Sequence, residues 1–171
     1  MNGTTRTKMR AAIACIGLIA AAAMPAARAA DAEDVAEGMR LFMQKGNCQQ
    51  CHGWAGDGRK MDNQAPDGAN LRESKLDRKA FVMIVKCGLP NTGMPPFDRL
   101  AYSDGRCYGK KQSELKAAGI KLADPPATLQ PREVELLADF VFAKVAGQGP
   151  MTKAKCTEYW GSAAEVCNDV K

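Results

Sequence analysis

Apolar residues recur at helical spacing in three segments of the chain, and each segment predicts an amphipathic helix. The predicted helices cover residues 34–46, 77–87 and 131–145. Gly46 suits the end of the first helix, and Pro131 occupies a favoured first position in the third. The positions expected to face the core are Val35, Met39, Phe42, Met43, Ala80, Phe81, Ile84, Val85, Val134, Leu137, Ala138, Val141 and Val145.

The segments between these helices are rich in Gly, Pro, Asp and Asn, which is typical of loops. Residues 53–72 are predicted to be loop, and two prolines force residues 91–97 to be extended. Residues 98–129 are polar and irregular, with one short helix expected at residues 112–118. Because no segment of useful length alternates with the period of a strand, the sequence predicts an all-α fold with long loops.

The first 29 residues have the pattern of a signal peptide. A basic start is followed by an apolar run over residues 11–23 and by an A-x-A cleavage site at residues 27–29. The run is too short to be retained as a membrane span, so we expect an exported, periplasmic protein that begins at Ala30. Cys15 raises the alternative of a lipoprotein anchor, but residues 12–14 match a lipobox poorly.

Removal of this peptide changes the charge of the protein. The whole chain carries 24 basic and 19 acidic residues, a net charge of +5. Four of the basic residues and none of the acidic ones lie in the signal peptide, which leaves 20 basic against 19 acidic residues. No basic stripe with interleaved aromatic residues remains, so nucleic-acid binding is set aside.

The run Cys48-Gln49-Gln50-Cys51-His52 is the most specific chemical signal in the chain. Two thiols at this spacing can bond to the two vinyl groups of one porphyrin, and the following imidazole can bind the iron. The motif occurs once, so one covalent c-type haem is expected. The alternatives are a thioredoxin-like redox pair and half of a zinc site, although the chain has no second His to complete such a site.

Four further cysteines follow, and an even number in an exported protein indicates disulfides. They are Cys87, Cys107, Cys156 and Cys167, and they allow three connectivities. Short loops close at low entropic cost, which favours the pairs Cys87–Cys107 and Cys156–Cys167. The alternative of four thiolates around one metal is unattractive at such scattered positions.

His52 is the only histidine, so a second protein ligand to the iron must be of another kind. The methionines outside the signal peptide are Met39, Met43, Met61, Met83, Met94 and Met151. Met94 is favoured, because Gly93 before it and two prolines after it form a rigid segment that can hold a thioether against a flat ring. The others are expected to pack in helices or to lie in unconstrained segments; a Lys, a small molecule or no ligand at all are the alternatives.

These residues resemble, in their order and spacing, the class I (mitochondrial-like) c-type cytochromes over roughly residues 35–145. The match rests on Gly38, Leu41, Phe42, Cys48, Cys51, His52, Ile84, Gly88, Gly93, Met94, Pro95, Pro96, Phe97, Leu129, Glu133, Val134, Leu137, Phe140 and Val141. The resemblance implies three to five helices around one covalent haem, with His52 and Met94 as axial ligands and Leu71 packed on the haem. A carbonyl within residues 65–69 is the expected partner of the His52 imidazole.

The resemblance also implies a function. With both axial positions filled, the protein is expected to be an electron carrier and not an enzyme. A quinoprotein alcohol dehydrogenase is the expected donor, and an oxidase or another cytochrome the expected acceptor. The alternatives are a haem-based sensor or peroxidase-like enzyme, and a cytochrome subunit fixed to one dehydrogenase. The cytochrome domain is expected over residues 30–146; the long loop at 98–130 and the tail at 147–171 depart from the family and bear on the choice of partner.

Overall fold

The structure, a computed structural model, describes residues 1, 3, 31–60, 63–161, 164–168 and 170, so nearly all of the predicted signal peptide lies outside the described residues. Its α-helices are α1 (Ala32–Arg40), α2 (Gln49–His52), α3 (Arg78–Cys87), α4 (Gln112–Ala117), α5 (Pro131–Lys144) and α6 (Lys153–Trp160). The other elements are a π-helical turn, η1 (Leu41–Lys45), and two 3-10 turns, η2 (Leu71–Glu73) and η3 (Glu165–Cys167). The all-α prediction is confirmed, but the described residues contain six α-helices where three to five were expected.

The predicted helices form close to their expected bounds because local hydrogen bonds define their ends. Asp31 and Asp77 cap α1 and α3 by accepting from backbone N–H groups three residues further on, at 2.8 and 2.7 Å. The helix predicted over residues 34–46 ends differently in the structure. Residues 41–45 form the π-helical turn η1, and the N–H of Gly46 donates to the carbonyl of Leu41 at 2.8 Å, five residues back.

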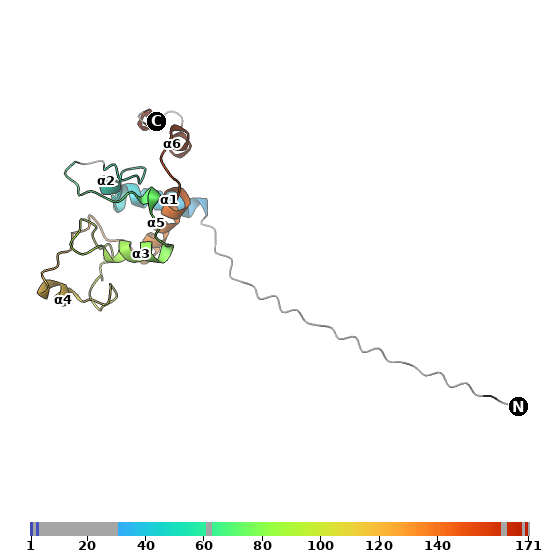
Figure 1. Cartoon of the computed structure of the whole chain (residues 1–171), viewed down its shortest axis with the longest axis horizontal. Helices are drawn as coiled ribbons and strands as arrows, with labels where there is room; N and C mark the ends of the chain where they lie inside the picture. The colour runs from blue at the N-terminus through green and yellow to red at the C-terminus, as the bar shows by residue number, and fades with distance from the viewer. Residues whose placement is uncertain (2, 4–30, 61–62, 162–163, 169, 171) are drawn as a thin grey trace.

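The main core lies where α1 crosses α5, with α3 packed against α5 as well (Figure 1). A Cβ atom on Gly38 would lie 2.0 Å from the carbonyl oxygen of Leu136, so only glycine allows the two backbones to approach this closely. The rings of Phe42 and Phe140 meet at the crossing, with centroids 5.6 Å apart. The predicted stripe of α5 is buried, and Leu136 and Phe140, which the pattern did not include, are buried as well.

The long loop at residues 98–130 forms a small core with the end of α3, which was not predicted. Its cluster consists of Cys87, Tyr102, Cys107 and Leu115. The disulfide Cys87–Cys107 joins this loop, called the insertion below, to the end of α3. The short helix α4 forms near its expected position and brings Leu115 into the cluster. In Figure 1, α4 and α6 lie on opposite sides of the molecule.

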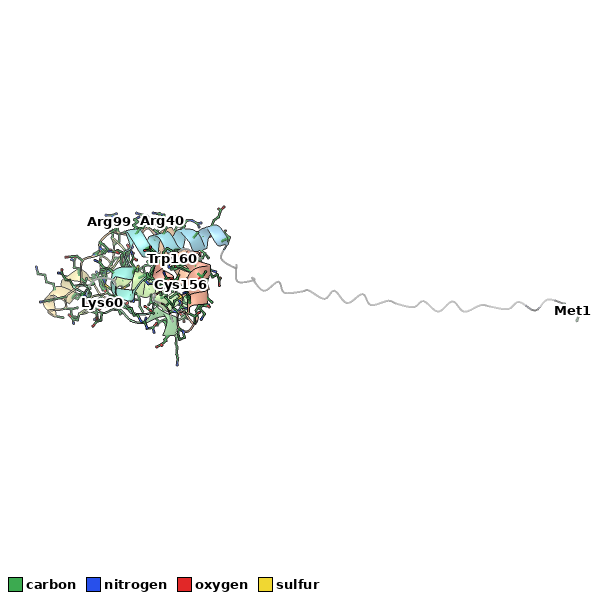
Figure 2. The ribbon with its side chains drawn as sticks, turned by 90° about the horizontal axis from the view of Figure 1, so that it is seen from above. Met1, Arg40, Lys60, Arg99, Cys156 and Trp160 are labelled. Atoms are coloured by element: carbon green, nitrogen blue, oxygen red, sulfur yellow. A yellow bond between two sulfur atoms is a disulfide. The ribbon has the colours of Figure 1, made fainter. Side chains whose placement is uncertain are left out.

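The tail is also helical, and the sequence analysis predicted no helix there. The disulfide Cys156–Cys167 joins α6 to η3. Figure 2 shows Cys156 and Trp160 against the body of the domain. The ring contacts are Tyr159 with Phe140, at 5.9 Å between centroids, and Trp160 with Trp54, at 6.0 Å. Aromatic packing therefore attaches the tail to the α1–α5 crossing and to the loop that follows α2.

Candidate functional site

A single helical turn carries the cysteine pair, although the sequence analysis assigned no helix to the motif. After η1, Asn47 takes a left-handed conformation with φ 47°, and α2 follows directly. The N–H of His52 donates to the carbonyl of Cys48 at 2.9 Å. This turn places Cys48 and Cys51, three residues apart, on one side of the helix. Cys48 packs against the main core, and burial raises the pKa of its thiol to about 12.

A backbone carbonyl from the following loop orients the imidazole of His52. Its Nδ1 lies 2.8 Å from the carbonyl oxygen of Ala69. With Nδ1 as the donor to that carbonyl, Nε2 keeps the lone pair that can bind a metal. Burial lowers the pKa of His52, against the opposing effect of the Ala69 carbonyl, and this favours the neutral ring. Ala69 is thus the residue of the 65–69 segment that supplies the expected carbonyl.

Gly68 allows this loop to come close to the ring. A Cβ atom on Gly68 would lie 2.6 Å from the carbonyl oxygen of Cys51 and 2.9 Å from Nδ1 of His52. The N–H of Gly68 also donates to the carbonyl of Cys51 at 3.1 Å. The loop is therefore closed against the Nδ1 side of the imidazole, and any larger side chain at position 68 would push it away.

Met94 lies in a turn whose backbone is fixed by hydrogen bonds. Its N–H donates to Oγ1 of Thr92 at 3.1 Å, and its carbonyl accepts from the N–H of Leu89 at 3.0 Å. The turn folds back on the end of α3, where Gly88 has φ 63° and a Cβ atom would lie 2.7 Å from the carbonyl oxygen of Met94. Hydrogen bonds and close backbone contacts therefore hold the segment around Met94, where the prolines also restrict the backbone.

The loop that follows His52, called the His52 loop, contacts the turn that carries Met94, called the Met94 turn. A Cβ atom on Gly93 would lie 2.4 Å from Cγ of Pro66, so these two residues are in close contact. Cys48, Leu71 and Met94 are all partly buried against the main core cluster. Residues from three separate segments of the sequence therefore border the same apolar cluster.

The other methionines differ in their surroundings. Met39 and Met43 pack against the main core, as expected for methionines on a helix. Met83 is 37% exposed on α3. Met151 lines a cavity of about 650 Å³ beside the tail. Met61 lies outside the described residues.

The donor set of this region fits a c-type haem. It offers two thiols on one helical turn, an imidazole whose Nε2 is available, and a thioether in a rigid turn, next to an apolar cluster. Within the part of the chain that the structure describes, no group of three or more His, Cys, Asp or Glu side chains is arranged to hold a metal ion.

The sequence analysis missed two tyrosines beside this region. The hydroxyls of Tyr102 and Tyr108 donate to the carbonyls of Cys87 and Gly88, at 2.8 and 2.9 Å. Both tyrosines lie in a segment that was predicted to be irregular. Their position on either side of Cys107, a cysteine expected to be bonded to Cys87, was the available signal.

Comparison with known protein families agrees with this geometry. Residues 33–106 match the family model described as cytochrome C oxidase, cbb3-type, subunit III. This part of the chain is a cytochrome c domain. No curated protein and no solved structure matched the chain.

The cytochrome c domain defines the cofactor and the general chemistry. With Cys48 and Cys51 in its attachment motif, it carries one covalent haem c. A cytochrome c domain implies haem-based electron transfer between redox partners, and such a domain is typically an electron carrier. No helix among the described residues is both long and apolar enough to cross a membrane.

Proposed function

We propose that the protein is a periplasmic electron carrier in which His52 and Met94 are the axial ligands of the haem iron. The observation that carries this proposal is the 2.8 Å hydrogen bond between Nδ1 of His52 and the carbonyl of Ala69, because it leaves Nε2 for the iron. The position of Met94 supports it: the thioether is in a hydrogen-bonded turn that contacts the His52 loop through Gly93 and Pro66.

The proposed ligands explain why the haem iron would accept an electron readily. The haem supplies a one-electron couple between ferric and ferrous iron. The soft thioether of Met94 and the apolar surroundings of the site favour the ferrous state and raise the reduction potential. Hydrogen bonds hold both ligand segments, so neither ligand needs to move when the electron arrives. Two filled axial positions leave no open position for O₂ or peroxide, which favours electron transfer over a sensor or a peroxidase-like enzyme.

The proposed donor is a quinoprotein alcohol dehydrogenase, and the proposed acceptor is an oxidase or another cytochrome. The donor rests on the resemblance to periplasmic class I cytochromes. The matched family model is named for a subunit of an oxidase, which supports the oxidase as acceptor. Contacts of this kind are small and brief, so the protein is proposed to be a free shuttle and not a permanently fixed subunit.

The test is to mix the oxidised protein with a reduced quinoprotein alcohol dehydrogenase, follow haem reduction by absorbance, and then add an oxidase. We expect one electron to enter and leave in each cycle. A Met94→Ala variant should be reduced about tenfold more slowly or worse, because its potential falls. Met43→Leu, which keeps an apolar side chain in the core, should leave the rate within about twofold.

Other outcomes of this experiment would contradict the proposal. Failure of wild-type reduction, together with ready binding of carbon monoxide to the chemically reduced protein, would favour a sensor or a peroxidase-like enzyme. Stable co-elution with the dehydrogenase would favour a fixed subunit. Protein sequencing of the same preparation should give Ala30 as the first residue, and a retained N-terminal segment would contradict the proposed signal peptide at residues 1–29.

A further inference from the structure

The end of α3 and the start of the Met94 turn are held by side chains of the insertion. The disulfide Cys87–Cys107 bonds the last residue of α3 to the insertion. Tyr102 donates to the carbonyl of Cys87 at 2.8 Å, and Tyr108 donates to the carbonyl of Gly88 at 2.9 Å. One covalent bond and two hydrogen bonds therefore meet at two consecutive residues, six and seven positions before Met94.

A second pair of contacts lies closer to Met94. The N–H of Asn91 donates to the carbonyl of Lys121 at 2.8 Å, and the N–H of Lys121 donates to Oδ1 of Asn91 at 3.0 Å. Because this pairing is reciprocal, it fixes Asn91 relative to the far end of the insertion. The segment from Cys87 to Asn91 is thus attached to the insertion at both ends.

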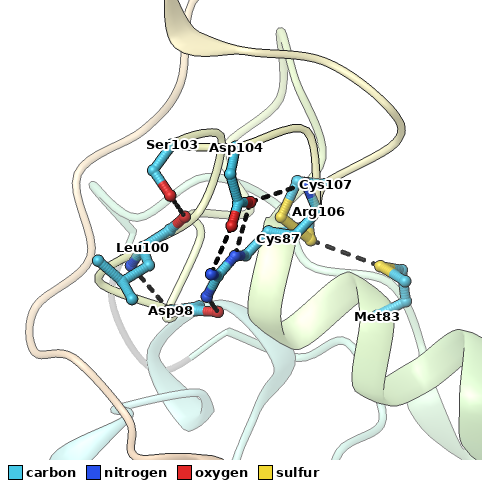
Figure 3. A network of polar contacts seen from close by, with 8 residues as sticks. All are labelled: Met83, Cys87, Asp98, Leu100, Ser103, Asp104, Arg106 and Cys107. Atoms are coloured by element: carbon cyan, nitrogen blue, oxygen red, sulfur yellow. Dashed lines mark hydrogen bonds and ion pairs between the residues drawn. A yellow bond between two sulfur atoms is a disulfide. The ribbon is translucent and has the colours of Figure 1, made fainter.

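The insertion is itself well ordered by internal contacts. Figure 3 shows Arg106 beside Asp98 and Asp104: its Nε donates to Oδ1 of Asp104 at 2.9 Å, and its Nη1 lies 3.6 Å from Oδ2 of Asp98. The N–H of Asp98 donates to the carbonyl of Lys86 in α3 at 3.0 Å. Leu115 packs in the small core that includes the disulfide. Such an element can resist movement of the segment that it contacts.

Both tyrosines have backbone conformations that non-glycine residues rarely adopt. Tyr102 has φ 59° and Tyr108 has φ 54°. Left-handed backbone costs energy in residues with a Cβ atom and persists where surrounding contacts determine it. Burial raises the pKa of both hydroxyls, so they remain hydrogen-bond donors throughout the neutral range. Two tyrosines in this conformation both donate hydrogen bonds to the end of α3, which indicates that these contacts have a function.

We propose that residues 98–122 form a clamp that positions Met94, with Tyr102, Tyr108 and the Cys87–Cys107 disulfide as its positioning groups. The inference rests on the proposed function, because it requires Met94 to be an iron ligand. Detachment of Met94 requires its turn to move away from the haem, and the clamp raises the free energy of that open state. The insertion thereby sets the fraction of protein in which the iron position proposed for Met94 is accessible to another ligand.

The experiment is an equilibrium titration of the oxidised, haem-loaded protein with imidazole, which competes with Met94 for the iron. The apparent affinity for imidazole is proportional to the fraction of protein in which Met94 is detached, so it measures how strongly the clamp opposes detachment. The double variant Cys87→Ser/Cys107→Ser should bind imidazole about tenfold more tightly than the wild type, or tighter still. The matched control is Cys156→Ser/Cys167→Ser, which removes the tail disulfide and should change the affinity by less than about twofold.

A second pair of variants keeps both disulfides and covers the case in which the serine variants do not fold. Tyr108→Phe removes one hydroxyl from the clamp and should increase the imidazole affinity roughly two- to tenfold. Tyr159→Phe is its control in the tail, where the buried hydroxyl has no hydrogen-bond partner among the described residues. In a Met94→Ala background the Tyr108→Phe change should have no effect, because the position is already open.

The outcomes separate the clamp from the proposed function. If the wild type binds imidazole as tightly as Met94→Ala does, Met94 is not the ligand and the proposed ligation fails. If the wild type binds weakly and Tyr108→Phe behaves like Tyr159→Phe, the ligation stands and the clamp is wrong. An effect of Tyr108→Phe that persists in the Met94→Ala background would also overturn the clamp, because it would then act on the haem pocket in general.

Discussion

At the scale of single residues, Gly68 and Gly93 allow the two proposed ligand segments to pack closely, and the carbonyl of Ala69 orients the imidazole of His52. The sequence alone predicts haem attachment at Cys48 and Cys51 and iron binding by His52, because thiol and imidazole chemistry at this spacing has few other uses. It was not sufficient to choose Ala69 within the 65–69 segment. That choice depends on how tightly the loop closes, and Gly68 sets this closure through contacts that no local pattern encodes.

Gly68→Ala should loosen the hydrogen bond between Ala69 and His52. The new Cβ atom would lie within 3 Å of both Cys51 and His52, so the loop must shift. We expect a loss of about 1–3 kcal/mol in the free energy of unfolding. The reduction potential should rise, because a weaker hydrogen bond at Nδ1 makes the imidazole a poorer electron donor. Equal potentials in Gly68→Ala and the wild type would contradict the role of Gly68.

At the scale of elements, hydrophobic periodicity predicted the three long helices well. It did not predict η1, because the change from α to π hydrogen bonding leaves the apolar spacing of Phe42 and Met43 nearly unaltered. It also missed α2 and α6, which are short and polar. At the junction of η1 and α5, Nζ of Lys45 lies 2.6 Å from Oε1 of Glu133. This ion pair joins the turn that leads into the haem motif to the first turn of α5.

The pH dependence of stability should reveal the Lys45–Glu133 pair. Burial raises the pKa of Glu133, but Lys45 and the N–H of Gln130 lower it by more, so the folded value lies below the ordinary 4.5. A lowered pKa gives a stabilisation that is present above about pH 4.5 and is lost as the pH falls through the folded value. Glu133→Gln should therefore be about 1 kcal/mol less stable than the wild type at pH 7, and the difference should shrink in acid.

Chemical denaturation at pH 7 and at pH 3.5 measures this difference. Glu158→Gln is the matched control, because it removes the carboxylate of an exposed ion pair. The Glu158 side chain is 75% exposed, and its Oε1 lies 3.7 Å from Nζ of Lys144. The control should match the wild type at both pH values. A Glu133→Gln penalty that stays constant with pH would show that the carboxylate charge is not the source of the stabilisation.

At the scale of the whole molecule, the loop at residues 98–130 and the tail at residues 147–171 each contain a cysteine of a disulfide. The pairing of cysteines was favoured by short loops in the sequence, and both disulfides form in the structure. The small core around Tyr102 and the burial of Arg72 could not be anticipated, because both depend on contacts between distant segments. Arg72 is almost completely buried and donates to the carbonyls of Ala55 and Gly149, which joins the start of the tail to the haem-motif loop.

The most direct test of the whole account is the visible spectrum of the oxidised protein beside that of Met94→Ala. Ferric haem with a methionine sulfur ligand has a weak absorption band in the far red, which the resemblance to class I cytochromes implies here. The account predicts this band in the wild type and in Met43→Leu, and its loss in Met94→Ala. A wild-type spectrum without the band, from a protein that binds carbon monoxide readily once reduced, would contradict His52/Met94 ligation and the electron carrier built on it.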